Sequence, residues 1–66
     1  MLAMTVVRKD KGITQVGLSN LTGIAEPQIS AIENKHIKPC EEWQERIVKA
    51  LGWERDPAEL FEDVSI

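Results

Sequence analysis

The sequence predicts an all-α fold, a compact bundle of about five short helices in one domain that spans residues 1–66. Apolar residues recur at intervals of three and four positions, which is the spacing of one face of a helix. Gly12, Gly23 and Gly52 each follow such a stretch, and glycine often ends a helix because it adopts a positive φ without strain. A chain of 66 residues, 42% of them hydrophobic, suffices for one small core and not for two domains.

The first helix is expected over residues 2–11. Met4 and Val7 are expected to face the core, and Gly12 is expected to end the helix. The polar residues of its second half are expected to lie in solvent: Lys9, Asp10 and Lys11.

Residues 14–34 predict two short helices joined by a tight turn at Gly23, and the rest of the chain is expected to support this helix-turn-helix. Thr14 is a suitable N-cap, because its hydroxyl can accept a hydrogen bond from a free N–H group of the first turn. Leu18 and Leu21 are expected to form the inward apolar stripe of the first of these helices.

The second helix of this unit is expected to bury one face and expose another. Ile24 is expected to turn inward ahead of it, and Ile29, Ile32 and Glu33 follow at the spacing of an inner face. The outer face is left with small, amide and carboxylate side chains: Glu26, Gln28, Ser30, Ala31 and Asn34. Such a face suits the major groove of DNA, where long apolar side chains could not pair with base edges.

The segment 35–40 is expected to be a loop in which Ile37 points inward and Pro39 precedes the next helix. That helix is expected over Glu41–Leu51, and Gly52 is expected to close it. Its inner face is expected to consist of Trp43, Ile47, Ala50 and Leu51.

A short fifth helix is expected to begin after Asp56, with Pro57 at its first position and Glu59 three residues after the cap. The segment 53–66 carries more apolar surface than so small a core requires, in Trp53, Leu60, Phe61, Val64 and Ile66.

These features together resemble the helix-turn-helix of the Cro and phage-repressor type, the XRE-like family of transcriptional regulators. The likeness extends from about Val7 to Leu51. It depends on Arg8, Thr14, Gln15, Leu18, Gly23, Ile29, Ile32, Glu33, Asn34, Pro39, Ala50, Leu51 and Gly52. The resemblance implies a lambda-repressor-like DNA-binding domain.

The resemblance and the residue chemistry together assign the candidate site. Gln28 is the main candidate for base contact, because its amide can donate and accept at once to adenine. The candidate base contacts are Glu26, Gln28, Ser30 and Ala31, and the candidate phosphate contacts are Thr14, Gln15, Asn34, Lys35, His36 and Lys38. An ordinary exposed glutamine is the alternative for Gln15.

The resemblance also implies two structural contacts. Arg8 is expected to pair with Glu33, which would tie the first helix to the third. Residues of the segment 53–66 are expected to form a homodimer interface that would set two DNA-reading helices about one DNA turn apart: Trp53, Leu60, Phe61 and Val64. The alternative is that Trp53, Leu60 and Phe61 close the core of a single copy.

The chain departs from the family pattern at several caps and turns. Ala25 stands where relatives usually carry a serine or threonine N-cap, so that cap is lost. Cys40 stands at another N-cap, and sulfur is a weak acceptor. Lys35 stands where relatives prefer glycine, which predicts either a strained positive φ or a different helix end.

The charge distribution bears on DNA binding. The net charge of −3 is unfavourable for contact with phosphates. Residues 1–40, however, carry five basic and three acidic side chains, whereas residues 41–66 carry three basic and eight acidic ones. The first part therefore has a charge of +2 and the second of −5, so the acidic part is expected to face away from DNA.

Composition argues against several other functions. The chain offers no convergent set of titratable groups and little room for a deep pocket, so we expect no enzyme activity and no cofactor. His36 has no plausible metal-binding partner except Cys40, which is too few ligands for a structural zinc site. One cysteine, no apolar run of membrane length and no signal-like segment predict a cytoplasmic protein.

The sequence therefore predicts a small regulator that binds double-stranded DNA, a repressor of the phage or mobile-element kind, with no small-molecule substrate. The alternative is a protein-interaction module, such as an antitoxin-like partner protein that docks through its acidic C-terminal half. The sequence leaves open the operator, repression or activation, any partner protein, dimer formation without DNA, and the natural start at Met1 or Met4.

Overall fold

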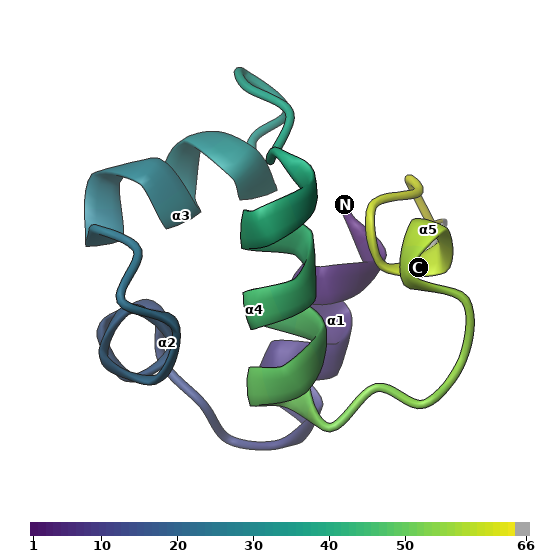
Figure 1. Ribbon diagram of the computed structural model, residues 1–66, viewed down its shortest axis with the longest axis horizontal. Coiled ribbons are helices and arrows are strands. Elements are labelled where there is room, and N and C mark those ends of the chain that lie inside the picture. Colours follow the sequence, from purple (N-terminus) through teal and green to yellow (C-terminus); the bar gives the residue numbers. More distant parts are fainter. Residues whose placement is uncertain (65–66) are drawn as a thin grey trace.

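The computed structural model of the protein describes residues 1–64 and confirms the all-α fold (Figure 1). The chain forms α1 (Ala3–Asp10), α2 (Gln15–Thr22), α3 (Glu26–Glu33), α4 (Glu41–Leu51) and α5 (Pro57–Leu60). Within the described residues the only extended pairing is one isolated bridge between Leu2 and Asp63. The predicted apolar residue Ile66, and with it the end of the segment 53–66, lies outside the described residues.

Helix α4 stands in the middle of the molecule, with α2 and α3 on one side and α5 on the other (Figure 1). Helix α2 packs against both α3 and α4, whereas α5 packs against α4 and α1. Every helix sends at least one side chain into a single core, which consists of Leu2, Met4, Leu18, Ile24, Ile29, Ile32, Ile47, Leu51 and Leu60. Val7, Trp43 and Ala50 pack against this core as predicted but remain partly exposed.

The prediction that Leu21 faces inward is wrong, because its side chain is 61% exposed. Thr22 is buried in its place, and the Thr22 hydroxyl donates to the carbonyl of Leu18 at 2.8 Å and accepts from the Ile24 N–H at 3.2 Å. The inner stripe of α2 follows the step of four residues from Leu18 to Thr22, which leaves Leu21 on the outer surface.

The prediction that Ile37 points inward is also wrong, because Ile37 is 38% exposed. Pro39 is the buried residue of this loop. The loop turns at Lys35, which has the positive φ of 64° that the sequence predicted as one of two possibilities. Ile37 instead lines a shallow apolar groove of about 180 Å³ together with Leu2 and Phe61.

Several helix ends carry the caps that the sequence predicts. The Thr14 hydroxyl accepts from the Gly17 N–H at 2.9 Å, and the Asp56 carboxylate accepts from the Ala58 N–H at 3.0 Å. Gly23 follows α2 with a left-handed φ of 73°. Ala25 and Cys40 precede α3 and α4 without any side-chain cap, as the sequence predicts.

Removing the Thr14 cap is expected to destabilise the protein modestly. Thr14→Ala leaves the Gly17 N–H without its acceptor, which costs about 1 kcal/mol and lowers the melting temperature by about 5 °C. Thr14→Ser keeps the oxygen and is expected to melt close to wild type. Thermal unfolding followed by circular dichroism checks both variants, and equal melting temperatures for the alanine and serine variants would contradict the capping role.

Candidate nucleic-acid interface

The four candidate base-contact residues lie on the outer side of α3. Glu26 and Gln28 are exposed, and Ser30 and Ala31 are partly exposed. The opposite side of α3 is fixed in the core, because Ile29 and Ile32 are 0% and 1% exposed. The outer face of α3 therefore has a defined orientation, as side chains that contact base edges require.

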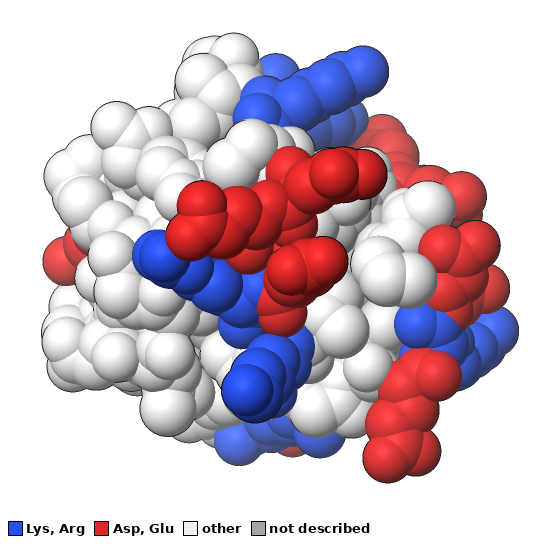
Figure 2. Space-filling model, viewed as in Figure 1, with Lys and Arg blue, Asp and Glu red and all other residues white. Residues whose placement is uncertain are grey.

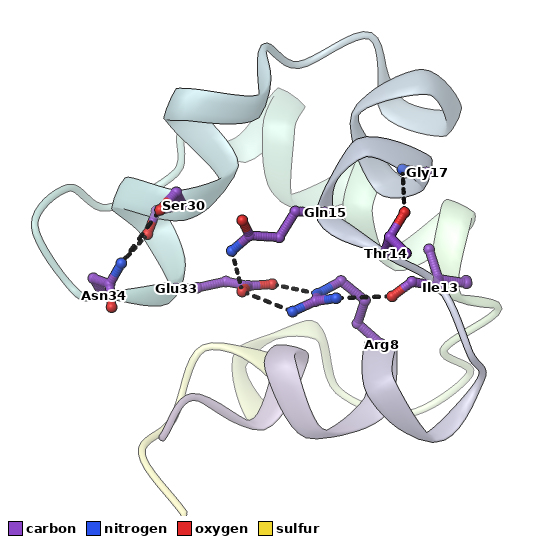
Figure 3. Close-up of polar contacts among 8 residues, drawn as sticks. All are labelled: Arg8, Ile13, Thr14, Gln15, Gly17, Ser30, Glu33 and Asn34. Atoms are coloured by element: carbon purple, nitrogen blue, oxygen red, sulfur yellow. Dashed lines mark hydrogen bonds and ion pairs between the residues drawn. The ribbon is translucent and has the colours of Figure 1, made fainter.

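The predicted ion pair between Arg8 and Glu33 is present and buried (Figure 3). Arg8 Nε donates to Glu33 Oε2 at 2.7 Å and Arg8 Nη2 donates to Glu33 Oε1 at 3.1 Å. The two side chains are only 8% and 5% exposed. Arg8 Nη1 also donates to the carbonyl of Ile13 at 2.8 Å, so one guanidinium holds α1, α3 and the segment before α2. Two parallel charge-assisted hydrogen bonds make this a rigid connection.

Gln15 and Asn34 are two candidate phosphate contacts. Their side-chain amides already donate hydrogen bonds within the protein (Figure 3). Gln15 Nε2 donates to Glu33 Oε1 at 2.9 Å, which adds the first turn of α2 to the same buried network. Asn34 Nδ2 donates to the carbonyl of Ser30 at 2.9 Å and so holds the end of α3. Asn34 Nδ2 also donates to the Ser30 hydroxyl oxygen at 3.3 Å. An amide nitrogen carries two hydrogens, so Gln15 keeps one of them for a ligand.

The remaining candidate phosphate contacts lie around α2 and in the loop after α3. Thr14 is exposed at the start of α2, and Lys35, His36 and Lys38 are all exposed in the loop. Lys38 and His36 make no ion pair within residues 1–64. Lys35, in contrast, pairs with Asp63 at 3.0 Å.

Asp63 does not follow the expectation that the acidic part of the chain faces away from DNA. Its carboxylate accepts from the N-terminal amine at 2.8 Å and from Lys35 Nζ at 3.0 Å, so one acidic residue lies beside the candidate phosphate-contact loop. A phosphate that contacts Lys35 would compete with this carboxylate. No local pattern in the sequence indicates this contact, because 28 positions separate the two residues.

The two hydrogen bonds, first from the N-terminal amine and then from Lys35, lower the pKa of Asp63 from 3.8 to about 2. Because the pKa is lowered in the folded state, the stabilisation is complete above pH 3.8 and is lost as the pH falls through 2. We expect the carboxyl carbon of Asp63 to titrate near pH 2 by NMR. Lys35→Met should move that midpoint toward 3.8 and Lys38→Met should not; a wild-type midpoint near 3.8 would contradict these contacts.

The surface over α2 and α3 is almost uncharged (Figure 2). Between Gly12 and Ile32 the chain carries a single charged residue, Glu26. Lys, Arg, Asp and Glu side chains gather instead over α4, over α5 and near the loop that follows α3 (Figure 2). Val16 and Leu21 are 52% and 61% exposed on α2, which makes its outer surface partly apolar.

The predicted dimer residues mostly belong to the core of one copy. Leu60 is 0% exposed, so its side chain offers no surface to a second copy, and the prediction is wrong at this residue. Trp53 and Phe61 pack against the core, and Trp53 Nε1 donates to the carbonyl of Asp56 at 3.0 Å. Val64, 36% exposed, is the most exposed of the predicted dimer residues.

Lys9 is a candidate residue that the sequence analysis missed. It borders a polar hollow of about 310 Å³ that Gln15 and Asn34 also line. The sequence did contain a signal, because Thr5, Arg8 and Lys9 follow at positions i, i+3 and i+4 and so share one face of α1. Since Arg8 pairs with Glu33 of α3, that face had to point toward the helix-turn-helix.

No helix within residues 1–64 is both long and apolar enough to cross a membrane. Comparisons of the chain with models of known protein families, with curated proteins and with solved structures find no match.

Proposed function

We propose that the chain binds double-stranded DNA through the outer face of α3 and the segment 34–38, and that it acts in the cytoplasm as a small transcriptional repressor. The observation that carries this proposal is the fixed orientation of α3. Its inner face is held by Ile29, Ile32 and the buried Arg8–Glu33 pair, while Gln28 stands exposed on the other side. Helices that enter the major groove require such a rigid, small-residue face.

The side chains on α3 define what this face can read. The Gln28 amide can donate to adenine N7 and accept from adenine N6, and the Glu26 carboxylate can accept from cytosine N4. Ser30 can contact several bases, and Ala31 can contact the methyl group of thymine. With a single strong bidentate group on the face, much of the specificity would come from DNA shape.

Phosphate contacts would come from the loop after α3. Lys38 and His36 are exposed and make no ion pair within the described residues, and Lys35 can exchange Asp63 for a phosphate. Lys35 and Lys38 are the two cations of this loop, so we expect a shallow salt dependence, with a slope near −2 for about two charged phosphate contacts. A homodimer would double the contact area and supply two half-sites.

The proposal is tested by salt titrations of binding to DNA from upstream of the gene and to random-sequence duplex. We expect the upstream DNA to bind at least a hundredfold tighter. Gln28→Ala should remove most of this preference, and Lys38→Ala should weaken both complexes and reduce the salt slope by about one. Lys49→Ala on α4 is the matched control for Lys38→Ala. If neither DNA binds at low salt, the proposal fails.

A protein-interaction module is the second candidate, and the uncharged α2–α3 surface favours it. Val16 and Leu21 are largely exposed on that surface, and apolar groups of this size more often contact protein than phosphate. The acidic segment after residue 40 would then contribute charge complementarity toward a basic partner. Specific binding to DNA in the titration above would exclude this as the main function.

A further inference from the structure

The shallow apolar groove of about 180 Å³ lies where the start of the chain, the loop after α3 and the end of α5 meet. In the view of Figure 1 the N-terminus lies between α3 and α5. The apolar part of the lining consists of Leu2, Ile32, Ile37, Pro39 and Phe61. A cavity of roughly 150 Å³ holds a benzene ring, so the groove has room for one aromatic or aliphatic side chain.

The walls of the groove are fixed by contacts within the protein. Ile32 is 1% exposed and is held in the core. The loop that carries Ile37 is tied at both ends. At its start, the Lys35 N–H donates to the carbonyl of Ile32 at 3.0 Å. At its end, Gln44 Nε2 of α4 donates to the carbonyl of Pro39 at 3.0 Å. A surface that is already ordered loses little conformational entropy when a partner binds.

Exposed apolar side chains gather at this end of the molecule. Ile37, 38% exposed, forms one wall of the groove. Met1 and Val64 are 48% and 36% exposed, and the Val64 N–H donates to the carbonyl of Met1 at 2.8 Å. Both are next in the chain to the bridged residues Leu2 and Asp63, and Leu2 lines the groove. Exposed apolar side chains that lie together mark contact sites for proteins, whereas scattered ones do not.

Two lysines, Lys35 and Lys38, stand at the rim of the groove. Lys38 is exposed and makes no ion pair within residues 1–64. Lys35 shows which kind of group the rim accepts, because its Nζ pairs with the Asp63 carboxylate at 3.0 Å. An apolar centre with a charged rim is the composition of a protein-binding site, and the charge of this rim favours an acidic partner.

The apolar floor and the cationic rim together select among possible occupants. The DNA backbone offers oxygens to the lysines, but it has no apolar side chain to fill the groove. A second copy in a two-fold contact would meet this patch with the same patch, which would bring the lysine rims of both copies together. A peptide segment with carboxylates beside a large apolar side chain satisfies both parts of the groove.

We propose that the groove binds an acidic segment of a partner protein. One large apolar side chain of that segment lies against Ile37 and Phe61, and a carboxylate pairs with Lys38. Because Lys38 is also a proposed phosphate contact, the partner and DNA exclude each other, and this part of the inference rests on the proposed function. The partner thereby releases the chain from DNA without contacting the outer face of α3.

The peptide arm of the test uses NMR of the ¹⁵N-labelled protein. The probes are three acetylated and amidated pentapeptides, Asp-Asp-X-Asp-Asp, in which X is Leu, Phe or Trp. We expect at least one of them to give saturable shifts at Ile37, Lys38 and Phe61, with a millimolar dissociation constant. The same peptide with Asn in place of Asp should bind about threefold or more weakly at low salt, and Ser at X should abolish binding.

Variants of the protein assign the peptide to the groove. Ile37→Ser should weaken peptide binding about fivefold to tenfold, and Lys38→Gln about threefold. Ile37→Leu should retain it. The matched controls lie outside the lining and should bind as wild type does: Val16→Ser, at a side chain 52% exposed on α2, and Lys49→Gln, at an exposed cation on α4. Circular dichroism confirms that each variant is folded, as expected for changes at exposed side chains.

The DNA arm adds the tightest of the three peptides to the complex with upstream duplex. We expect this peptide to release the DNA and its Ser counterpart to leave the DNA bound. If the peptide binds the groove but DNA stays bound, mutual exclusion is wrong. If wild type binds no DNA, the proposed function fails, and the peptide arm alone decides whether the groove is a docking site.

Three results would overturn the docking site itself, whether or not DNA binds. The first is that no acidic peptide binds, or that the shifts fall outside the groove. The second is that the Asn peptide binds as tightly as the Asp peptide. The third is that the free protein self-associates in analytical ultracentrifugation and Ile37→Ser abolishes the association, because a second copy then occupies the groove.

Discussion

Glu33→Ala is expected to remove most of the stability of the protein. The change leaves the Arg8 guanidinium, 8% exposed, without its carboxylate partner, and an unpaired buried charge costs about 3 to 5 kcal/mol. A domain of this size has roughly 3 to 10 kcal/mol in total. The melting temperature should therefore fall by at least about 12 °C, or the cooperative transition should disappear.

Thermal and urea unfolding followed by circular dichroism measure this effect. Glu45→Ala is the matched control, because Glu45 is exposed on α4 and makes no ion pair within residues 1–64. The double variant Arg8→Met, Glu33→Leu removes both charges and should be more stable than Glu33→Ala alone. A Glu33→Ala melting temperature within 2 °C of wild type would show that the pair does not connect α1 to α3.

Leu60→Ala is expected to produce the second large loss of stability. Leu60 is 0% exposed on the four-residue helix α5, and it is the buried core residue through which that helix is anchored. Truncation of a buried leucine costs about 2 to 5 kcal/mol, depending on how far the cavity collapses. The loss should be the same at every protein concentration, because the side chain lies in the core of one copy.

Concentration dependence distinguishes this core role from a dimer interface. If Leu60 contacted a second copy, the wild-type melting temperature would rise with concentration and Leu60→Ala would abolish that rise. Val64→Ala is the control, because Val64 is 36% exposed and should cost less than about 1 kcal/mol. A loss below 1 kcal/mol for Leu60→Ala would contradict its place in the core.

Local signals in the sequence predicted the helices well. Thr14, Asp56, Gly23 and Gly52 mark their ends in the structure as they do in the sequence, because a cap or a positive φ depends on a few neighbouring residues. The range Glu41–Leu51 agrees at both ends.

The errors arose where tertiary packing decides between neighbouring positions. Leu21 and Thr22 are both at helical spacing from Leu18, and only the positions of α3 and α4 select Thr22 for burial. Hydrophobicity favoured Leu21, but Thr22 satisfies its hydroxyl within the backbone and can be buried. Leu60 was similarly ambiguous, since an apolar residue near a chain end suits a core or an interface equally.

Contacts between distant segments were predicted from the sequence only where a known family pattern links the two positions. The Arg8–Glu33 pair was predicted because the family resemblance links those two positions. The contact of Asp63 with Lys35 had no such guide. It places a carboxylate beside the candidate phosphate-contact loop and so alters the electrostatics of the candidate interface.

The most direct test of the proposed DNA interface is an NMR titration of the ¹⁵N-labelled protein with a duplex from upstream of the gene. We expect the largest shifts at the exposed residues of α3, at residues 34–38 and at Gln15, with the segment 53–64 nearly unchanged. Shifts confined to α4 and the segment 53–64, or no shifts at low salt, would contradict DNA binding through α3 and would direct attention to a protein partner.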